Sequence, residues 1–469
     1  MRKDKMQQKK APVEQLKLFT RKGEPVNGQA GGTSNTCETG AELSSRLNQQ
    51  RTLTEHILER IVDYGNIDKA YRQVKSNDGS SGVDGMEIEE LRQWLGRHIK
   101  ELQESILQEQ YKVNAVRKVE IPKPTGGTRM LGIPTVKDRL IQQAIHQELN
   151  RYYEPYFSDH NYGFRPGRNA GQAILQASAY IAEGREWVVD IDLEKFFDKI
   201  NHDRLMQRLS KGIGDKRLLR LINAYLKTGM MTDGLTEQRT AGTPQGSPLS
   251  PLLSNIVLDE LDRELEKRGL HFCRYADDCN IFVRSRKAGE RVLVSLTDYI
   301  EKKLKLKVNR EKSGVRHCSA VKFLGYTVMP EGKIRAADKS IERLKDKLRK
   351  LTTRSRGVTL AQIVKELNAV ILGWTNYFHL ANTWLSTFRG IDGWLRRKLR
   401  CYRLKQCGRK YTLFKFLRSF DIPIHTSWHV VMYSGGWWNM SQKKAVCKAM
   451  NLEWFARLGL LSLHVRLSG

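Results

Sequence analysis

The sequence predicts an α+β fold in which a mixed sheet domain precedes a helical one. Between residues 115 and 335, short runs rich in β-branched and aromatic residues alternate with helical patterns. After residue 338, apolar residues recur at helical spacing and basic residues accumulate. One apolar stripe of this part consists of Ile341, Leu344, Leu348 and Leu351.

The size and the charge of the chain limit its class. Its 469 residues are too many for one ordinary core, so we expect about two to four domains. It carries 81 Lys and Arg against 51 Asp and Glu, a formal net charge of +30. Such a field attracts polyanions, and nucleic acid is the commonest. A basic protein without such a partner and a membrane-surface protein are the alternatives, although no apolar stretch approaches the ~20 residues of a spanning helix.

Composition divides the chain into five parts. We expect a flexible basic arm over 1–50, a helical segment over 51–110, a mixed sheet domain over 111–335, a basic helical domain over 336–430 and a short segment over 431–469. The arm is rich in Gly, Ser, Thr and Gln and can bury little surface. In the helical segment, apolar residues share one helix face: Leu91, Leu95, Leu102 and Ile106. Thr359 and Gln362 predict the start of a helix as a capping box.

The seven cysteines are scattered and form no CxxC pair, which argues against a zinc ribbon or finger. We expect free thiols in a reducing compartment. The N-terminus has no apolar core of a secretory signal, so we expect a cytoplasmic protein.

Two adjacent carboxylates stand in the run Tyr275-Ala276-Asp277-Asp278, between two strand-like stretches. This pattern predicts a hairpin with a charged tip. Because neighbouring carboxylates repel each other unless a cation neutralises them, the tip is a candidate site for Mg²⁺, which prefers hard oxygen ligands. The alternative is a solvated turn, in which Asp is common.

A second acidic cluster lies upstream in a strand-like run. Asp190, Asp192 and Glu194 alternate with apolar residues and would share one face of a strand. Asp192 beside the two-Asp tip would gather three acids around one point, which suits two metal ions about 3.5–4 Å apart. The alternative is an edge strand with unrelated acids.

Three further segments suit a nucleotide or a nucleic acid. Lys123 and Arg129 flank a Gly-Gly turn, where cations can bind a triphosphate, unless this is an ordinary basic hairpin. Gln245 lies in a Pro- and Gly-rich loop whose small residues allow close backbone approach to a ligand; the alternative is a helix-entry loop. Residues 393–410 carry eight basic and no acidic residues, interspersed with apolar ones, and predict an RNA-binding helix rather than a solvated face. Its main candidates are Arg396, Arg397, Lys398, Arg400 and Arg403.

Five motifs in this order resemble those of a reverse transcriptase. They are FRPGR (164–168), DIDLEKFFD (190–198), TPQGSPLSPLLSN (243–255), RYADD (274–278) and KFLGY (322–326). More closely, the stretch from about residue 52 to 430 resembles the bacterial group II intron reverse transcriptase and maturase family. LNAVILGWTNYF (367–378) is similar to its maturase, or thumb, motif, and the SGVDG loop (81–85) to its N-terminal extension.

The resemblance implies a right-hand polymerase. Its fingers and palm would occupy residues 111–335, after an extension over 51–110, and its helical thumb residues 336–430. We expect the palm to be an antiparallel sheet with helices on one face.

The resemblance also implies functions for individual residues. Asp192, Asp277 and Asp278 would hold two Mg²⁺ ions, with Mn²⁺ as a substitute, and Lys312 would protonate the leaving pyrophosphate. Phe197 would lie under the sugar of the incoming nucleotide and exclude a 2′-hydroxyl. The residues expected to contact the dNTP or the nascent base pair are Lys123, Arg129 and Gln245. The expected supports of the metal turn and the primer end are Tyr275, Phe323, Leu324 and Gly325. Further RNA contacts are expected from Arg165 and Arg168.

The implied partners are a group II intron RNA, an RNA template with its DNA primer, a DNA target and dNTPs, bound by a monomer or homodimer. The implied location is the bacterial cytoplasm, in association with the nucleoid, and the short segment 431–469 is a candidate for contact with DNA or RNA. Related proteins often end in an HNH endonuclease with Cys pairs. Only about 40 residues follow position 430, without such pairs, so we expect no target cleavage by this chain and a primer from another source. Two alternatives stay open: an RNA-folding factor without polymerase use, and a host-adopted reverse transcriptase used in defence or repair.

Overall fold

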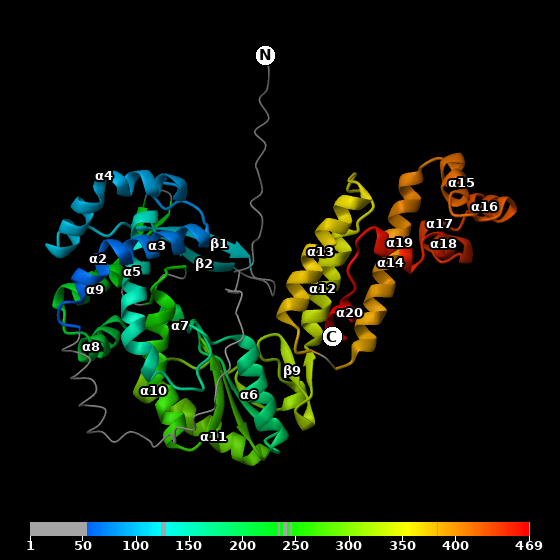
Figure 1. Cartoon of the computed structure of the whole chain (residues 1–469). Helices are drawn as coiled ribbons and strands as arrows, with labels where there is room; N and C mark the ends of the chain where they lie inside the picture. The colour runs from blue at the N-terminus through cyan, green and yellow to red at the C-terminus, as the bar shows by residue number, and fades with distance from the viewer. Residues whose placement is uncertain are drawn as a thin grey trace. The chain divides into compact units, whose positions relative to one another are not determined.

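A computed structural model describes residues 54–122, 128–232, 235–237, 242–243, 246–381 and 383–468 (Figure 1). The predicted arm over 1–50 lies outside these residues. Contacts join Gly40–Gly469 into one unit, which contains all the described residues.

Helices form the first part of the described chain. They are α2 (Ile57–Val62), α3 (Tyr64–Asn77) and α4 (Ile88–Leu107), and they pack against α5 (Val136–Tyr153). The predicted apolar face of α4 is confirmed, because Leu91, Leu102 and Ile106 are buried in this core. The SGVDG loop lies against the start of α5, since a Cβ at Gly82 would stand 2.5 Å from the Cα of Thr135.

A small sheet follows in the order β2-β1-β4-β5. Its strands are β1 (Val116–Pro122), β2 (Thr128–Ile133), β4 (Met230–Thr232) and β5 (Leu235–Glu237). β1 and β2 form the predicted basic hairpin, with Ile121 opposite Arg129. Lys123 and the Gly-Gly turn lie outside the described residues, and only the backbone of Arg129 is described.

The predicted antiparallel palm sheet is confirmed. Its order is β6-β7-β3-β8, and all three strand pairs are antiparallel. The strands are β3 (Trp187–Ile191), β6 (His271–Tyr275), β7 (Asp278–Val283) and β8 (Gly314–His317). Strands far apart in the sequence thus place the DIDL and YADD motifs side by side in the centre of the sheet.

The expectation of helices on only one face of this sheet is wrong. Alternate residues of β3 belong to different cores: Val189 packs with α11 (Arg286–Tyr299), whereas Val188 shares a core with α6 (Ala170–Ala182). The Tyr180 ring of α6 lies 5.6 Å from the ring of Phe282, the partner of Val188 on β7. Figure 1 shows both helices next to the sheet. The face with α6 is the one that carries Asp190 and, by the same alternation, Asp192.

The remaining helices of this part surround the sheet or extend from it. They are α7 (Phe196–Lys199), α8 (His202–Gly212), α9 (Lys216–Lys227) and α10 (Ser250–Lys267). A two-stranded ribbon, β9 (Tyr326–Val328) with β10 (Ile334–Ala336), leads to the helical part.

Three long helices form the predicted helical domain: α12 (Asp338–Leu351), α13 (Leu360–Tyr377) and α14 (Leu385–Cys407). Thr359 caps α13 as predicted, because its side chain accepts a hydrogen bond from the Gln362 amide. Six shorter helices follow among the described residues: α15 (Lys410–Arg418), α16 (Ile424–Val431), α17 (Gly436–Met440), α18 (Lys444–Ala449), α19 (Leu452–Arg457) and α20 (Leu463–Ser468).

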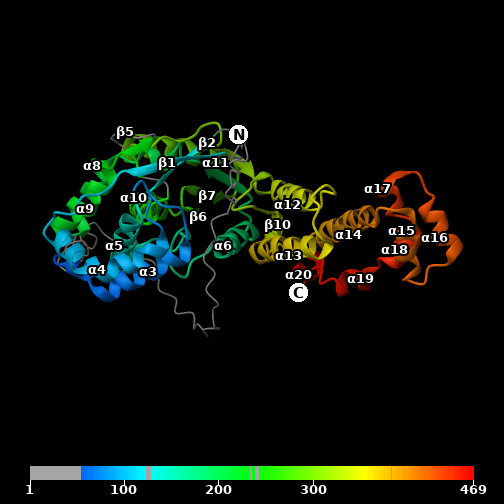
Figure 2. The same cartoon turned by 90° about the horizontal axis from the view of Figure 1, so that it is seen from above.

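The segment 431–469, predicted as a separate part, shares the core of these helices. Met440, Val446 and Leu463 are buried in the same cluster as Leu395 of α14. The Asp392 carboxylate on α14 accepts hydrogen bonds from the backbone amides of Leu463 and His464. Figure 2 shows α20 beside α13 and α14.

Two other expectations concern membrane-spanning helices and the cysteines. Within the described ranges, no helix combines the length and the apolar character needed to cross a membrane. The six cysteines of these ranges are free thiols, and five of them are buried.

Candidate active site

The sheet register brings the three predicted metal acids to one end of the palm. The β3–β7 ladder ends where Ile191 faces Cys279, so Asp192 follows directly where β7 begins at Asp278. Asp278 also faces Tyr275 across the β6–β7 hairpin, whose turn contains Asp277. Ala276 adopts a φ of 58° in this turn, in the left-handed region that residues with a Cβ rarely occupy.

The electrostatics of this end are strongly negative. Burial, and then the charges of Asp277, Asp190 and Asp192, raise the pKa of Asp278 to about 7. The Lys312 ammonium partly opposes this effect, and its Nζ lies 3.4 Å from Asp192 Oδ2. The four carboxylates outnumber Lys312 and Arg316, which lie beside them, so a bound cation would neutralise the remaining charge of this site.

The position of Lys312 is fixed through the backbone of Asp192. The Asn309 amide donates to the Asp192 carbonyl at 2.9 Å, and the Asp192 amide donates to Ser313 Oγ at 3.0 Å. These two hydrogen bonds hold the loop that contains Lys312 beside β3. The structure therefore brings Lys312 to the acids, as expected from the sequence.

The donor chemistry at this end fits a hard divalent cation, because carboxylate oxygens are its preferred ligands. Within the described residues, however, no three acidic, His or Cys side chains converge closely enough to hold a metal ion as they stand. The ligand functions of Asp192, Asp277 and Asp278 therefore stay predictions.

One nearby residue, Arg316, was not selected from the sequence. Arg316 on β8 donates to Asp190 Oδ2 at 3.0 Å and to the Lys312 carbonyl at 2.8 Å, and thereby connects an acid of the cluster to the lysine loop. Only the pairing of β8 with β3 brings Arg316 to Asp190.

Glu194 was expected on the same face of β3 as Asp190. However, β3 ends before Glu194, and the Glu194 carboxylate pairs with Lys199 and Lys307 instead.

The buried side chain of Arg274 supports the backbone of the YADD turn. The Arg274 side chain is completely buried and donates to Asp262 Oδ1 at 2.6 Å. It also donates to the Ala276 carbonyl at 2.9 Å and to Asn255 Oδ1 at 3.1 Å. Sequence reasoning missed this function, although the arginine stands within the RYADD motif.

The same network explains why the FRPGR region and the PLLSN motif accompany RYADD. Asn255 Nδ2 donates to the Gly163 carbonyl at 2.9 Å. Gly163 itself touches the turn, because a Cβ at this position would lie 2.2 Å from the Ala276 amide nitrogen. Three segments that are distant in the sequence thus pack against the backbone of the turn that carries Asp277 and Asp278.

Phe197 lies beside the predicted nucleotide loop. The Thr243 amide donates to the Phe197 carbonyl at 2.7 Å. Gly242 permits this contact: its φ is +86°, and a Cβ would stand 2.7 Å from the same carbonyl oxygen. Gln245 is outside the described residues, so the contacts of its side chain stay a prediction.

The helical domain holds the predicted primer support. The Tyr377 hydroxyl donates to the Leu324 carbonyl at 2.9 Å, and the Ser340 hydroxyl donates to the Gly325 carbonyl at 2.9 Å. Gly325 has a φ of +87°, and a Cβ there would stand 3.1 Å from the Phe378 ring. The maturase-like motif of α13 therefore positions the turn of the KFLGY motif, in which Phe323 is buried.

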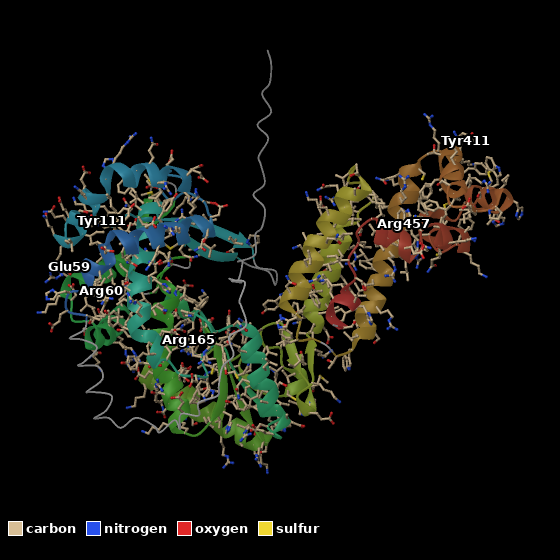
Figure 3. All side chains as sticks on the ribbon, viewed as in Figure 1. Glu59, Arg60, Tyr111, Arg165, Tyr411 and Arg457 are labelled. Atoms are coloured by element: carbon tan, nitrogen blue, oxygen red, sulfur yellow. The ribbon has the colours of Figure 1, made fainter. Side chains whose placement is uncertain are left out.

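The two arginines of the FRPGR motif bind to other residues of this chain. Arg165, labelled in Figure 3, has a side chain that is 5% exposed and donates to Glu154 and to the carbonyls of Ser158 and Asn161. Arg168 pairs with Asp159 and lies over the Tyr162 ring. These contacts make both residues part of the loop framework, and RNA contacts by them stay predictions.

Most of the basic candidates on α14 lie over aromatic rings. Arg397 covers Trp438, Arg403 covers Phe416 and Arg400 covers Phe455. Arg400 also donates to the Met450 carbonyl, and burial lowers its pKa. Lys398 also lies near the Trp438 ring, and Arg396 is half-buried. α14 thus uses part of its positive charge to bind the C-terminal helices.

Two family profiles match this chain. The profile for reverse transcriptase (RNA-dependent DNA polymerase) matches residues 121–328. The profile for the group II intron maturase-specific domain matches residues 341–419. The first match contains the palm sheet with its acids, and the second contains α13 and α14.

Curated relatives agree with these profiles. Protein YkfC of Escherichia coli is 31% identical over 287 residues, which cover 53% of this chain and 75% of YkfC. The group II intron-encoded protein LtrA of Lactococcus lactis subsp. cremoris is 30% identical over 325 residues, covering 55% of this chain and 54% of LtrA. A COX1/OXI3 intron 2 protein of Saccharomyces cerevisiae is 27% identical over 362 residues, covering 63% of this chain and 41% of its own length.

This chain thus spans three quarters of YkfC but about half, or less, of the other two relatives. The matched regions contain both the acidic sheet end and the helical domain that supports the KFLGY turn. The chain therefore belongs to the family of group II intron reverse transcriptases that carry a maturase-specific domain.

Proposed function

We propose that this chain extends a DNA primer along an RNA template, and that it binds a group II intron RNA to promote splicing and the copying of the intron into DNA. The observation that carries the proposal is the meeting of Asp192, Asp277 and Asp278 at one sheet end, with Lys312 beside Asp192. This combination of acids and a cation suits transfer of a nucleotidyl group.

In this reaction, a primer 3′-hydroxyl attacks the α-phosphate of a dNTP, and pyrophosphate leaves. The three aspartates would hold two Mg²⁺ ions, which when bound polarise the hydroxyl and neutralise the charge of the leaving group. Lys312 gives a proton to the pyrophosphate. Phe197 closes the space beside the sugar, and the KFLGY turn supports the primer end.

The maturase activity is a binding function, because the chemistry of splicing belongs to the RNA. Its support is the match of residues 341–419 to the maturase-specific domain, together with the +30 net charge of the chain. Each phosphate that the protein neutralises releases counterions, so RNA affinity should fall steeply as salt rises.

The proposal is tested by primer extension on an RNA template with Mg²⁺, and by splicing of the flanking intron RNA. The double variant Asp277→Asn, Asp278→Asn should lose cDNA synthesis and keep intron RNA binding. Asp298→Asn, which removes an exposed carboxylate on α11, is the matched control and should keep both. A wild-type chain that supports splicing without extending any primer would identify an RNA-folding factor instead.

A further inference from the structure

A cavity of about 390 Å³ lies where the end of α12, the middle of α14 and the short helix α17 meet. Three cationic residues line it: Arg349, Arg354 and Lys398. The rest of the lining is Thr352, Thr353, Cys401 and two indoles, Trp394 and Trp438. Within the described part of the chain, no acidic residue contributes to this lining, so the cavity combines positive charge with aromatic surface.

The two indoles are held in place around Lys398. The Lys398 Nζ lies 5.6 Å from the centroid of each ring, Trp394 and Trp438. Arg349 approaches Trp394 from α12, with its guanidinium carbon 5.9 Å from the ring centroid. The Arg349 side chain is 56% exposed and also pairs with Asp346 of α12, whereas Lys398 is half-buried between the two rings.

Trp438 is fixed by a residue that does not line the cavity. The Arg397 guanidinium stacks 3.6 Å from the Trp438 ring centroid and donates to the Trp438 carbonyl. The Cys401 thiol donates to the neighbouring Trp437 carbonyl. Both contacts tie α17 to α14, so the ring that borders the cavity is rigidly placed although it is 36% exposed.

This combination selects a ligand with a flat ring and a phosphate. A base gains stacking energy on an indole, and a phosphate gains charge-assisted hydrogen bonds from Arg and Lys. The size of the cavity falls in the range that holds small ligands. A base that is paired in a duplex cannot enter, because its faces are covered by its neighbours.

We propose that this cavity binds one unpaired nucleotide of a single-stranded RNA segment, with its base against Trp438 or Trp394 and its phosphate at Lys398 and Arg349. The inference rests on the proposed RNA-binding function and specifies one contact of it. The nucleotide comes either from an unpaired loop of the intron RNA or from the single-stranded part of the template ahead of the primer.

The test measures the affinity of the full chain for a short single-stranded RNA by fluorescence anisotropy. Trp438→Ala should weaken binding by about 5- to 150-fold, the range of one lost base stack. Trp428→Ala is the matched control, because this indole is 40% exposed and lies outside the cavity. Trp438→Phe, which keeps an aromatic ring, should retain most of the affinity and shows whether α17 remains folded.

Charge and base contacts are separated by two further probes. Lys398→Gln should lower the affinity for single-stranded RNA and for the same strand without bases, and reduce the salt slope by about 1. Trp438→Ala should leave the baseless strand and a blunt RNA duplex unaffected. Lys350→Gln removes the same charge from α12 outside the cavity and should change none of these affinities.

Two RNAs distinguish the sources of the nucleotide: the folded intron, and a primer–template with a single-stranded overhang. If Trp438→Ala loses affinity for only one of these two RNAs, that RNA is the source of the bound nucleotide. Cavity variants that bind RNA like Trp428→Ala and Lys350→Gln, in a chain that still extends primers, would overturn the inference and leave the proposed function intact. A wild-type chain that neither binds RNA nor extends primers would overturn the proposed function itself.

Discussion

Arg274 and Asp262 form an ion pair in which both side chains have no exposed surface. The same guanidinium holds the Ala276 carbonyl of the turn that carries Asp277 and Asp278. The charge pair in the core and the shape of the candidate metal turn are therefore linked through one side chain.

Asp262→Asn should destabilise the fold by about 3–5 kcal/mol, because it leaves a buried guanidinium without its counter-charge. Chemical denaturation followed by circular dichroism measures this loss. Primer extension should also fall, since Arg274 loses the partner that orients it towards Ala276.

The double variant Arg274→Met, Asp262→Leu separates stability from activity. Apolar residues of similar volume often replace a buried ion pair at little cost, so much of the stability should return. Primer extension should stay low, because the Ala276 carbonyl still lacks its donor. Recovery of activity together with stability would show that Arg274 serves the core alone.

The palm and its acids could be predicted from the sequence because both signals are local. Alternating apolar residues indicate a strand, and two adjacent acids in a turn are visible without any knowledge of the fold. The network behind the turn could not be predicted in this way. Asn255, Asp262 and Gly163 meet Arg274 or its turn only after three separate segments have packed together.

Two other differences have similar causes. The sequence pattern of the palm strands does not reveal that α6 covers the second face, because the apolar residues of this face, Val188 and Phe282, are followed by the polar pair Asp190 and Asn280. Basic residues on α14 suggest a surface for RNA, yet Arg397, Arg400 and Arg403 lie over aromatic rings contributed by later segments. A charge run alone does not show which charges the fold itself uses.

Gly163→Ala should strongly reduce primer extension, while the free energy of unfolding should fall only moderately. The added methyl group would stand 2.2 Å from the Ala276 nitrogen, so the YADD turn must move. Overpacking of this kind costs about 1–3 kcal/mol. Intron RNA binding should persist, as measured by filter retention.

Gly96→Ala is the control for this substitution. Gly96 lies inside α4, and a Cβ there would meet no heavy atom within 4 Å. The change should leave activity intact and raise stability by about 0.5–1 kcal/mol. Equal activities of the two alanine variants would contradict the proposed contact between Gly163 and the turn.

Lys312→Gln should reduce the rate of nucleotide addition by about 100-fold or more, the usual contribution of a positioned general acid. The reason is its position 3.4 Å from Asp192, at the end of the sheet where pyrophosphate would leave. Single-turnover kinetics at saturating dNTP and Mg²⁺ measures this step. Lys303→Gln, at an exposed position, should retain the wild-type rate. A defect in Lys312→Gln that is present at low Mg²⁺ and absent at saturating Mg²⁺ would instead indicate that Lys312 only balances the charge of the acids.

Phe197→Val should increase ribonucleotide incorporation. If the phenyl ring fills the space of the 2′-hydroxyl, a smaller side chain removes the clash, and the ratio of kcat/KM for dNTP over rNTP should fall by about 10-fold or more. The kinetics with dNTP serve as the internal control and should change little. The Phe197 carbonyl that binds the Thr243 amide is untouched by the substitution. Unchanged sugar discrimination would exclude this function for Phe197.

Tyr377→Phe should weaken the use of the primer, because it removes only the hydroxyl that donates to the Leu324 carbonyl. Tyr402→Phe is a closely matched control: its hydroxyl donates to the Val358 carbonyl at 2.8 Å, away from the KFLGY turn. Each variant should lose about 1 kcal/mol of stability, the usual value of one hydrogen bond. Only Tyr377→Phe should raise the KM for the primer–template, by a few-fold, since of the two hydroxyls only that of Tyr377 bonds to the turn at the primer end. Equal KM values in the two variants would mean that the hydrogen bond from the Tyr377 hydroxyl to Leu324 does not contribute to the use of the primer, and that the Tyr326 hydroxyl on the Tyr377 carbonyl and the Phe378 ring beside Gly325 suffice to hold the turn.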